Sequence, residues 1–451
     1  MLFRIDEQTL KDLNVFDGSS DGTPLIKLFS SVKTNGGKHK VQEMMKSPLV
    51  DIELLTQRKD AIKYFHDHNV ALVLEQINFE VIEIYLSNRD ERPKVNLIDS
   101  FLYYVRHRAT SNYYIKFSGI KNIALFCKFL KNLINGRLSN KLPSKLNSIY
   151  EEIETILKQE VFLKLLNLSP TKVRFNQLAS LDLNLRFKDR GKLIQLLQIV
   201  YELDAYQNVA SVAKQNGFGF ATYLASQSVK LEFEGLFHPK INNPVKNNLS
   251  LREDKNVIFL SGSNMSGKSS FLKSLGLSIY LSQIGFPVPA KAMVTSGFEG
   301  LVTTINLSDN IESGYSHFFS EVQRIKLIAE NLVESEKMVV ILDELFRGTN
   351  VKDAFDASLA TISALSTIKN SFFLISTHIV ELVPELKKHK NISFMYLETE
   401  FKNDHPNFTY QLKEGVSEEK VGMFIIKNER IINIIEIAAA KQKSKKDLFI
   451  K

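Results

Sequence analysis

The chain has 451 residues, which is enough for two or three domains, and its 44% hydrophobic and 24% charged residues are typical of a soluble globular protein. No apolar run is long enough to predict a membrane span, and the first twenty residues do not have the pattern of a signal peptide. The single cysteine, Cys127, excludes an internal disulfide, so we expect a cytoplasmic protein.

The net charge of +8 comes from one early segment. Between Ser100 and Tyr150 there is no acidic residue, and the nine basic residues are Arg106, Arg108, Lys116, Lys121, Lys128, Lys131, Arg137, Lys141 and Lys145. Tyrosines between these cations favour contact with a nucleic acid. The alternative is a solvated helical face whose aromatic side chains enter the core.

Long helices are predicted for residues 1–225. Glycine is scarce between Lys38 and Arg190, and apolar residues recur at helical spacing. One predicted face contains Ile153, Ile156, Leu157 and Val161, and another contains Leu193, Leu196, Leu197, Val200 and Leu203.

From about Leu231 short apolar runs alternate with helical stretches, which predicts a mainly parallel sheet with crossover helices. The predicted strands include Val257–Leu260, Met338–Leu342 and Phe372–Ile375. The expected class is therefore a helical domain over residues 1–225 followed by an α/β domain over residues 226–440. A short basic tail, residues 441–451, completes the chain.

A phosphate-binding loop is predicted directly after the first of these strands. The pattern has two glycines with four residues between them, followed by Lys and Ser. It is met by Gly262, Ser263, Asn264, Met265, Ser266, Gly267, Lys268 and Ser269, with Ser270 next. Backbone N–H groups and Lys268 would hold the phosphates, and the Ser269 hydroxyl would hold Mg²⁺. A glycine-rich turn is the alternative, but the flanking strand and helix favour ATP.

Two acids and a histidine follow the other predicted strands. Asp343 is expected to support Mg²⁺, and Glu344 to orient and deprotonate the attacking water. His378 is expected to sense the γ-phosphate, although a lone histidine is more often structural. Arg347 is placed to contact either the phosphates or a partner subunit.

These motifs together resemble those of the MutS family of DNA mismatch-repair ATPases. The Asn-Met pair in the loop, the segments Asp343–Thr349 and Thr377-His378, Phe237-His238-Pro239 and Ile284–Ala290 are all similar to family motifs. Weaker similarities begin near Asp6 and extend to Gly422, so the resemblance covers most of the chain.

The resemblance implies a homodimer of ATPase domains of the ABC type. Ser316 would reach the γ-phosphate bound by the partner, and closure would depend on ATP. The first half would correspond to the family's helical lever, and residues near the C-terminus to its dimer-contact segment. The implied activity is hydrolysis of ATP to ADP and phosphate.

Several departures from the family pattern are visible. Sequence similar to the lever begins at once, so we expect a truncated form without the mismatch-reading and connector domains. Ser266 and Phe346 replace glycines, and His317 replaces a threonine. Pro244-Val245 lie near the place where the family stacks the adenine on an aromatic side chain.

The favoured function is a DNA-linked ATPase in repair or recombination, acting on duplex or branched DNA without specific mismatch reading. Repair proteins are further candidate partners. Its candidate DNA contacts are Arg106, Arg108, Lys116, Lys121, Lys128 and Lys131. The alternative is a nucleotide-switched dimer whose helical half binds a protein or a structured RNA.

Overall fold

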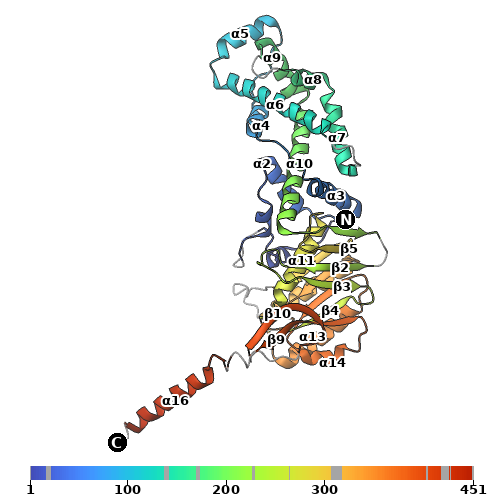
Figure 1. Cartoon of the computed structure of the whole chain (residues 1–451), viewed down its shortest axis with the longest axis vertical. Helices are drawn as coiled ribbons and strands as arrows, with labels where there is room; N and C mark the ends of the chain where they lie inside the picture. Colours follow the sequence, from blue (N-terminus) through green and yellow to red (C-terminus); the bar gives the residue numbers. More distant parts are fainter. Residues whose placement is uncertain are drawn as a thin grey trace. The chain divides into compact units, whose positions relative to one another are not determined.

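The chain folds into two compact units. In this computed structural model the described residues are 2–16, 22–136, 142–168, 173–225, 229–263, 265–305, 317–402, 405–417, 426 and 428–448. The helical unit comprises Leu25–Ser47 and Glu53–Gln215, and the sheet unit comprises Met1–Pro24, Pro48–Ile52 and Asn216–Lys451. All strands assigned within the described residues belong to the sheet unit (Figure 1).

The helical unit is built almost entirely from α-helices, as the sequence predicts. Its main helices are α2 (Asn35–Lys46), α3 (Ile52–His68), α4 (Phe79–Ser87), α5 (Leu97–His107), α6 (Ser111–Asn135), α7 (Ser144–Leu157), α8 (Glu160–Leu166), α9 (Phe175–Leu183) and α10 (Arg190–Asn216). A π-helical turn, Asn184–Lys188, joins α9 to α10. Helix α10 is buried on most sides, including the predicted face that contains Leu193, Leu196 and Val200.

Buried polar contacts fix the start of α2 against α10. Thr34 caps α2, and its backbone N–H and hydroxyl donate to the Asp204 carboxylate at 2.8 and 2.7 Å. A Cβ added at Gly36 would lie 2.2 Å from the Tyr201 ring, so only glycine allows this approach of the two helices. The chain segment before α3 is thereby anchored to the longest helix of the unit.

One predicted helical face is interrupted. Helix α7 ends at Leu157, and α8 begins at Glu160 after Gln159 takes an extended conformation. Val161 is therefore buried on a separate helix and does not continue the face of Ile153 and Ile156. The apolar spacing is the same in one continuous helix and in two successive helices, so periodicity alone did not reveal the break.

The larger sheet of the sheet unit has six strands in the order β10-β9-β4-β8-β7-β6. Its strands are β4 (Val257–Ser261), β6 (Gly300–Thr304), β7 (Met338–Leu342), β8 (Phe372–Ser376), β9 (Ile392–Lys402) and β10 (His405–Glu414). All neighbouring pairs are parallel except β9 and β10. The three predicted strands are confirmed as β4, β7 and β8, and the mainly parallel sheet is confirmed with them.

Helices cover both faces of this sheet, which explains why its central strands are buried throughout. One face packs against α12 (His317–Glu334), α13 (Val351–Ser366) and α14 (Val383–Leu386) through residues such as Val340 and Ile362. On the other face α11 (Lys268–Gln283) places Gly276 next to Ile341.

A second sheet has four strands in the order β1-β5-β2-β3, and in Figure 1 β5, β2 and β3 lie side by side. Its strands are β1 (Ala221–Leu224), β2 (Lys230–Leu236), β3 (Asn247–Arg252) and β5 (Ala292–Ser296). The chain ends in helix α16 (Ile431–Leu448).

The first residues of the chain belong to the sheet unit, whereas the sequence suggested one helical domain over residues 1–225. Helix α1 (Glu7–Asp12) packs against β6, and Arg4 exchanges backbone hydrogen bonds with Glu299 and Leu301. The Asp12 carboxylate accepts hydrogen bonds from the Thr303 hydroxyl and the Ile305 N–H at 2.7 and 2.9 Å.

Arg324 of α12 completes this attachment. Its guanidinium is buried, and it donates to both Asp6 carboxylate oxygens, to the Thr9 hydroxyl and to the Thr303 carbonyl. Burial alone would raise the pKa of Asp6, but the hydrogen bonds and charge of Arg324 hold it below its ordinary value. The contacts are specific polar ones, which apolar periodicity does not predict.

No helix in the described part of the chain combines the length and the apolar character needed to cross a bilayer.

We predict that Arg324→Leu destabilises the sheet unit by about 3 kcal/mol, because Asp6 and the Thr303 carbonyl lose their buried partner. The urea midpoint of unfolding measures the change. The matched control is Lys326→Leu on the same helix, whose side chain is 66% exposed and whose replacement should have little effect. Equal shifts of the urea midpoint for the two variants would contradict the stabilising role of Arg324.

Candidate functional site

The phosphate-binding loop lies between a buried strand and a long helix, in the order that the sequence predicts. Strand β4 ends at Ser261, and α11 starts at Lys268. Gly262 has φ +148°, and Gly267, the N-cap of α11, has φ +95°. A Cβ at Gly262 would lie 2.8 Å from the Ser266 hydroxyl. Glycines at both positions therefore let the backbone turn tightly into the helix N-terminus.

Lys268 is held inside this turn. Its side chain is almost completely buried, and Nζ donates to the carbonyl oxygens of Gly262 and Ser263 at 2.9 and 3.1 Å. Burial lowers the pKa of Lys268, whereas the nearby carboxylates of Asp343 and Glu344 act in the opposite direction. A cation placed here faces two acids that follow β7, which is separated from β4 by β8.

These two acids follow β7 directly. Since β7 and β8 end at the same edge of the sheet, the residues after β8 can contact them. The Asp343 N–H donates to the Thr304 carbonyl at 2.8 Å, and the Glu344 N–H donates to the Ser376 carbonyl at 3.1 Å. The Ser376 hydroxyl also donates to the Asp343 carboxylate. Backbone contacts on both sides thus fix the acids, and Glu344 takes a left-handed conformation with φ +54°.

Glu344 contacts two basic side chains at once. One carboxylate oxygen lies 2.7 Å from His378 Nε2, and the other accepts from Arg347 Nη1 at 2.8 Å. Burial would raise the pKa of Glu344, but the hydrogen bonds from His378 and Arg347 outweigh it and lower the pKa. The structure therefore brings Glu344 and His378 together, and places Arg347 on Glu344.

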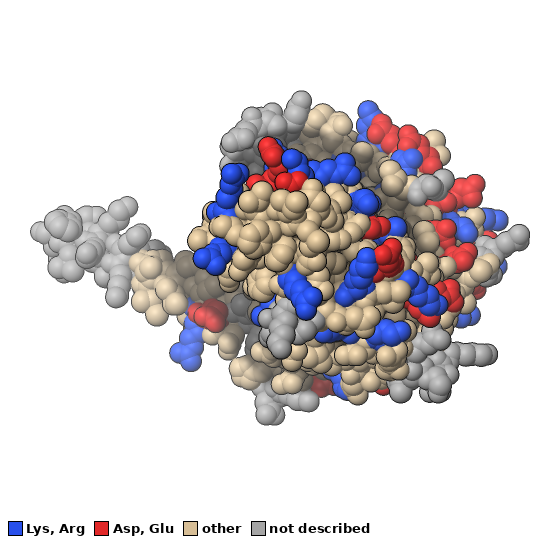
Figure 2. All heavy atoms as spheres, turned by 90° about the horizontal axis from the view of Figure 1, so that it is seen from above, with Lys and Arg blue, Asp and Glu red and all other residues tan. Residues whose placement is uncertain are grey.

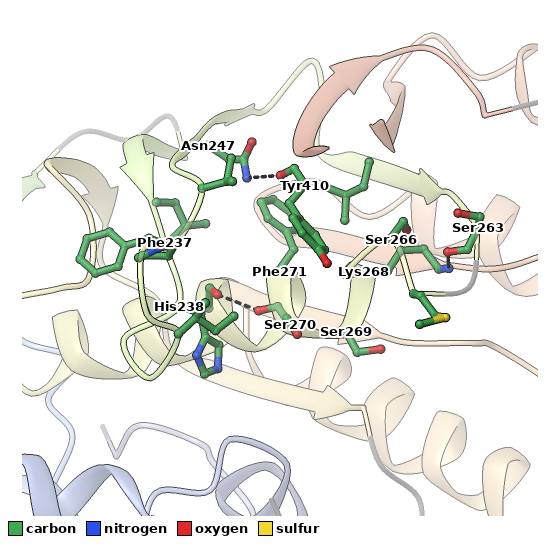
Figure 3. A pocket seen from close by; sticks show the side chains of 18 of the residues that line it. Phe237, His238, Asn247, Ser263, Ser266, Lys268, Ser269, Ser270, Phe271 and Tyr410 are labelled. Atoms are coloured by element: carbon green, nitrogen blue, oxygen red, sulfur yellow. Dashed lines mark hydrogen bonds between the residues drawn. The ribbon is translucent and has the colours of Figure 1, made fainter. Parts of the chain in front are cut away.

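A cavity of about 960 Å³ opens beside the loop (Figure 3). Its polar end is formed by Ser263 and residues 265–270 of the loop, with Glu344, Arg347 and His378. The other end is lined mainly by aromatic and apolar side chains: Phe237, His238, Ile241, Pro244, Val245 and Tyr410. The cavity has the size and the division between polar and apolar walls that a nucleotide needs.

Tyr410 is a candidate site residue that the sequence analysis missed. It lies in β10 where the pairing register with β9 shifts, its φ is +57°, and its ring lies beside Gly267. Asn247 holds the strand on both sides of it, donating to the Tyr410 carbonyl at 3.0 Å and accepting from the Leu412 N–H at 2.8 Å. No local motif marks this tyrosine, since its position depends on the bulge.

His238 was noted in the sequence only as part of a family motif, yet it lines the apolar end of the cavity. Its Nδ1 lies 3.3 Å from the Lys240 N–H that donates to it. Burial, with the charges of Lys240 and Lys273, lowers the pKa of His238 to about 4. His238 is therefore a neutral ring at pH 7.

The predicted magnesium residues lie together. Ser269, Asp343 and Glu344 all line a second cavity of about 130 Å³, and Ser269 and Glu344 also line the first. Within the described residues no group of three or more His, Cys, Asp or Glu forms a complete metal site. One or two carboxylates with a hydroxyl fit Mg²⁺, which takes its remaining ligands from phosphates and water.

Two predicted nucleotide contacts, Asn264 and Ser316, lie outside the described residues. The side chain of His317, with which α12 begins, is also not described. Phe346, which replaces a family glycine, has φ +57° and is buried against Phe318.

The candidate DNA contacts differ in exposure. Arg106, Arg108, Lys121 and Lys131 are exposed on α5, its C-terminal cap and α6. Lys128 is half-buried, and its Nζ donates to the Leu168 carbonyl at 3.0 Å.

Lys116 is not available for DNA, although the sequence analysis gave it as a candidate contact. It is buried, 3.0 Å from Asp90 and 3.7 Å from Asp182, and it donates to the Tyr103 hydroxyl. Asp182 is in turn paired with Arg186. Lys116 is thus part of an internal ionic network, because its acidic partners come from outside the acid-free segment.

Comparison with known proteins identifies the second half of the chain. Residues 258–446 match MutS domain V. The DNA mismatch repair protein MutS of Petrotoga mobilis is 22% identical in an alignment that covers 93% of this chain and 62% of that protein. The mouse MutS protein homolog 4 is 36% identical over 183 residues, 39% of this chain and 19% of that protein.

The human MutS protein homolog 4 gives 34% identity over the same share of the chain. In each of these comparisons the chain spans less than two thirds of the relative's length.

We predict that the Glu344 ion pairs stabilise the fold at neutral pH and not in acid. A carboxylate whose pKa is lowered by folding contributes stability above its unfolded pKa, and this is lost as the pH falls through the folded pKa. Urea midpoints of the parent and of Glu344→Gln should therefore differ at pH 7 and converge by about pH 3. A difference that stays constant with pH would exclude a contribution from the charge of Glu344.

Proposed function

Since the chain belongs to the MutS family through its domain V, we propose that it is an ATPase that hydrolyses ATP to ADP and phosphate in DNA repair or recombination. The observation that carries the proposal is the convergence of the phosphate-binding loop, Asp343, Glu344 and His378 on two cavities, whose linings share Ser269 and Glu344. The names of its relatives, which include DNA mismatch repair proteins, support the role in repair.

The triphosphate is proposed to lie along the loop. The N–H groups at the start of α11 and the Lys268 ammonium supply the positive potential. Lys268 donates to two loop carbonyls, and these short contacts are the ones that it would exchange for phosphate oxygens. Ser263 and Ser266 line the same wall.

The base is proposed to occupy the apolar end of the cavity. Tyr410 is 46% exposed and is fixed by Asn247, so its ring is available for stacking at a defined position. The neutral ring of His238 and the apolar side chains of Phe237 and Val245 line this end and exclude water from it. The sequence alone left the adenine contact open, because Pro244 and Val245 lie near the place of the family's aromatic residue.

Ser269 and Asp343 would hold Mg²⁺ next to the phosphates. The bound ion would neutralise charge that develops on the transferred phosphoryl group. Asp343 is kept in position by the Ser376 hydroxyl, which occupies one of its carboxylate oxygens and leaves the other for the ion or its water.

Glu344 is proposed to orient the attacking water. Its lowered pKa makes it a weak base but keeps it ionised, so it is better suited to accept a hydrogen bond from water than to remove a proton early. His378 holds one of its oxygens in place. Arg347, with a side chain that is 61% exposed, would have to release the other oxygen when water binds there.

A homodimer is proposed as the working form. On α16 the described side chains up to residue 440 are all exposed, and five of them are isoleucines: Ile431, Ile432, Ile434, Ile435 and Ile437. Such an apolar helix surface requires a partner in water. Contact with the second copy would suit the family, in which ATP binding closes two ATPase domains and Ser316 would complete the partner's site.

DNA is proposed as the ligand of the helical unit. The exposed cations of α5, its cap and α6 remain available after Lys116 and Lys128 are assigned to internal contacts. Contacts of this kind bind the phosphate backbone and depend on salt rather than on sequence.

The hydrolysis proposal is tested with two substitutions in the site. Lys268→Ala should weaken ATP binding and hydrolysis together, because the phosphate charge loses its buried cation. Glu344→Gln should keep ATP binding and lower turnover by at least about a hundredfold, because the water is no longer oriented. Phosphate release and fluorescent ATP binding measure the two effects.

The control is Glu336→Gln, an acid outside both cavities. Hydrolysis by Glu344→Gln at the parental rate would refute the assignment of the water-orienting residue, and absence of ATP binding by the parent would refute the proposed activity.

The DNA proposal is tested by replacing Arg106, Arg108, Lys121 and Lys131 with alanine. Duplex and branched DNA should then bind at least about tenfold more weakly, and the slope of log affinity against log salt should fall by up to about 3.6. The matched control replaces Lys27, Lys38, Lys158 and Lys164, which are exposed elsewhere on the helical unit.

Fluorescence anisotropy at several salt concentrations measures the affinity. If both sets behave alike, the α5–α6 surface is not the DNA site. If the parent protein does not bind DNA and its ATPase rate is unaffected by DNA, the function is that of a nucleotide-switched interaction protein.

A further inference from the structure

Helix α5 exposes an apolar stripe that the proposed ATPase site and DNA contacts do not use. Five of its large apolar side chains are at least 48% exposed: Leu97 66%, Ile98 74%, Phe101 50%, Leu102 48% and Val105 53%. Their spacing places all five on one side of the helix. In a helix of eleven residues, this stripe is most of the apolar content.

The opposite side of α5 is already packed, so the stripe is not simply a core face turned outwards. Ser100 is buried, Tyr104 stacks on Phe175 of α9, and the Tyr103 hydroxyl accepts from buried Lys116 of α6. These contacts determine the rotation of α5 about its own axis. Phe101 of the stripe also packs edge-on against Phe175 of α9 but stays half exposed, so these contacts leave the stripe accessible.

The size of the stripe points to a macromolecular partner. Monomeric proteins rarely expose a continuous apolar patch larger than a few hundred Å². Figure 2 shows a broad area without charged side chains on this end of the molecule, with both basic and acidic side chains around its border. A stable interface needs about 800 Å² from each partner.

We propose that α5 is a homotypic contact, in which the stripe packs against α5 of a second copy in antiparallel orientation. The stripe is apolar along its length, so a two-fold axis near Phe101 and Leu102 superimposes it on itself. Ile98 of one copy would then lie opposite Val105 of the other. This contact is separate from the proposed ATPase dimer and does not require nucleotide.

Charge along one edge of the stripe selects the antiparallel arrangement. Asp99 and Arg106 lie on the same edge, in the first and last turns of α5. In a parallel pair each would meet its own copy and repel it. In an antiparallel pair each Asp99 lies within about one helical turn of the other copy's Arg106, and the two helix dipoles also oppose each other.

Nucleic acid does not account for the stripe itself. Phosphates contact cations, and the exposed cations of this region lie beside the five apolar side chains rather than among them. A second copy offers a surface that matches both the apolar stripe and its charged edge.

Disulfide trapping tests the contact directly. The only native cysteine, Cys127, is fully buried and burial raises the pKa of its thiol to about 12, so it should remain silent. Full-length Leu102→Cys, without nucleotide and under mild oxidation, should form a covalent dimer at least about tenfold faster than the control Val73→Cys. Val73 is 62% exposed on the same unit.

A second pair of variants tests the apolar contribution. Val105→Asp placed in the Leu102→Cys background should abolish the excess cross-linking, whereas Val73→Asp in that background should leave it unchanged. Circular dichroism and the urea midpoint confirm that both variants fold. Cross-linking no faster than in the Val73→Cys control would overturn the proposal.

The orientation is tested by exchanging charges in the same background. Asp99→Arg and Arg106→Asp should each slow cross-linking by about two- to fivefold, and the double variant should restore it. Failure of the double variant to recover would exclude the antiparallel pair. Because no step uses ATP, loss of ATPase activity and loss of this contact can be distinguished.

Discussion

The parallel alignment of β4, β8 and β7 is the constraint on which the site depends. Leu260 is in register with Ser376, and Leu342 with Ile375, so all three strands end at one edge. The phosphate-binding loop, the acid pair and the segment that leads to His378 therefore meet without any long loop between them. The Glu344 N–H donates a hydrogen bond to the Ser376 carbonyl, so the end of β8 fixes the backbone that carries the Glu344 carboxylate.

Much of this arrangement could be predicted from the sequence, because the chemistry follows immediately after buried strands. Fully buried parallel strands appear as short apolar runs, and the polar residue that follows each run is necessarily at the strand end. Periodicity likewise indicated the helical first half. Its failure at Val161 has a simple cause, since two short helices can keep the apolar spacing of one long helix.

The remaining features depend on contacts between distant segments. Tyr410 reaches the cavity through a bulge held by Asn247, which is 163 residues away in the chain. Lys116 was assigned to the surface because its own segment has no acid, but Asp90 and Asp182 approach it from other helices. In both cases the determining partner lies outside any sequence window, so composition and spacing were not sufficient.

The attachment of the N-terminal residues to β6 and α12 makes the helical unit an insertion. The chain leaves the sheet unit after Pro24, returns for Pro48–Ile52, leaves again and comes back at Asn216. Four covalent crossings therefore join the two units. A fragment beginning near Asn216 would also leave the guanidinium of Arg324 without Asp6 and the edge of β6 without Arg4. The sheet unit is therefore not a contiguous stretch of sequence, and evolutionary exchange of the helical unit would have to preserve all four junctions.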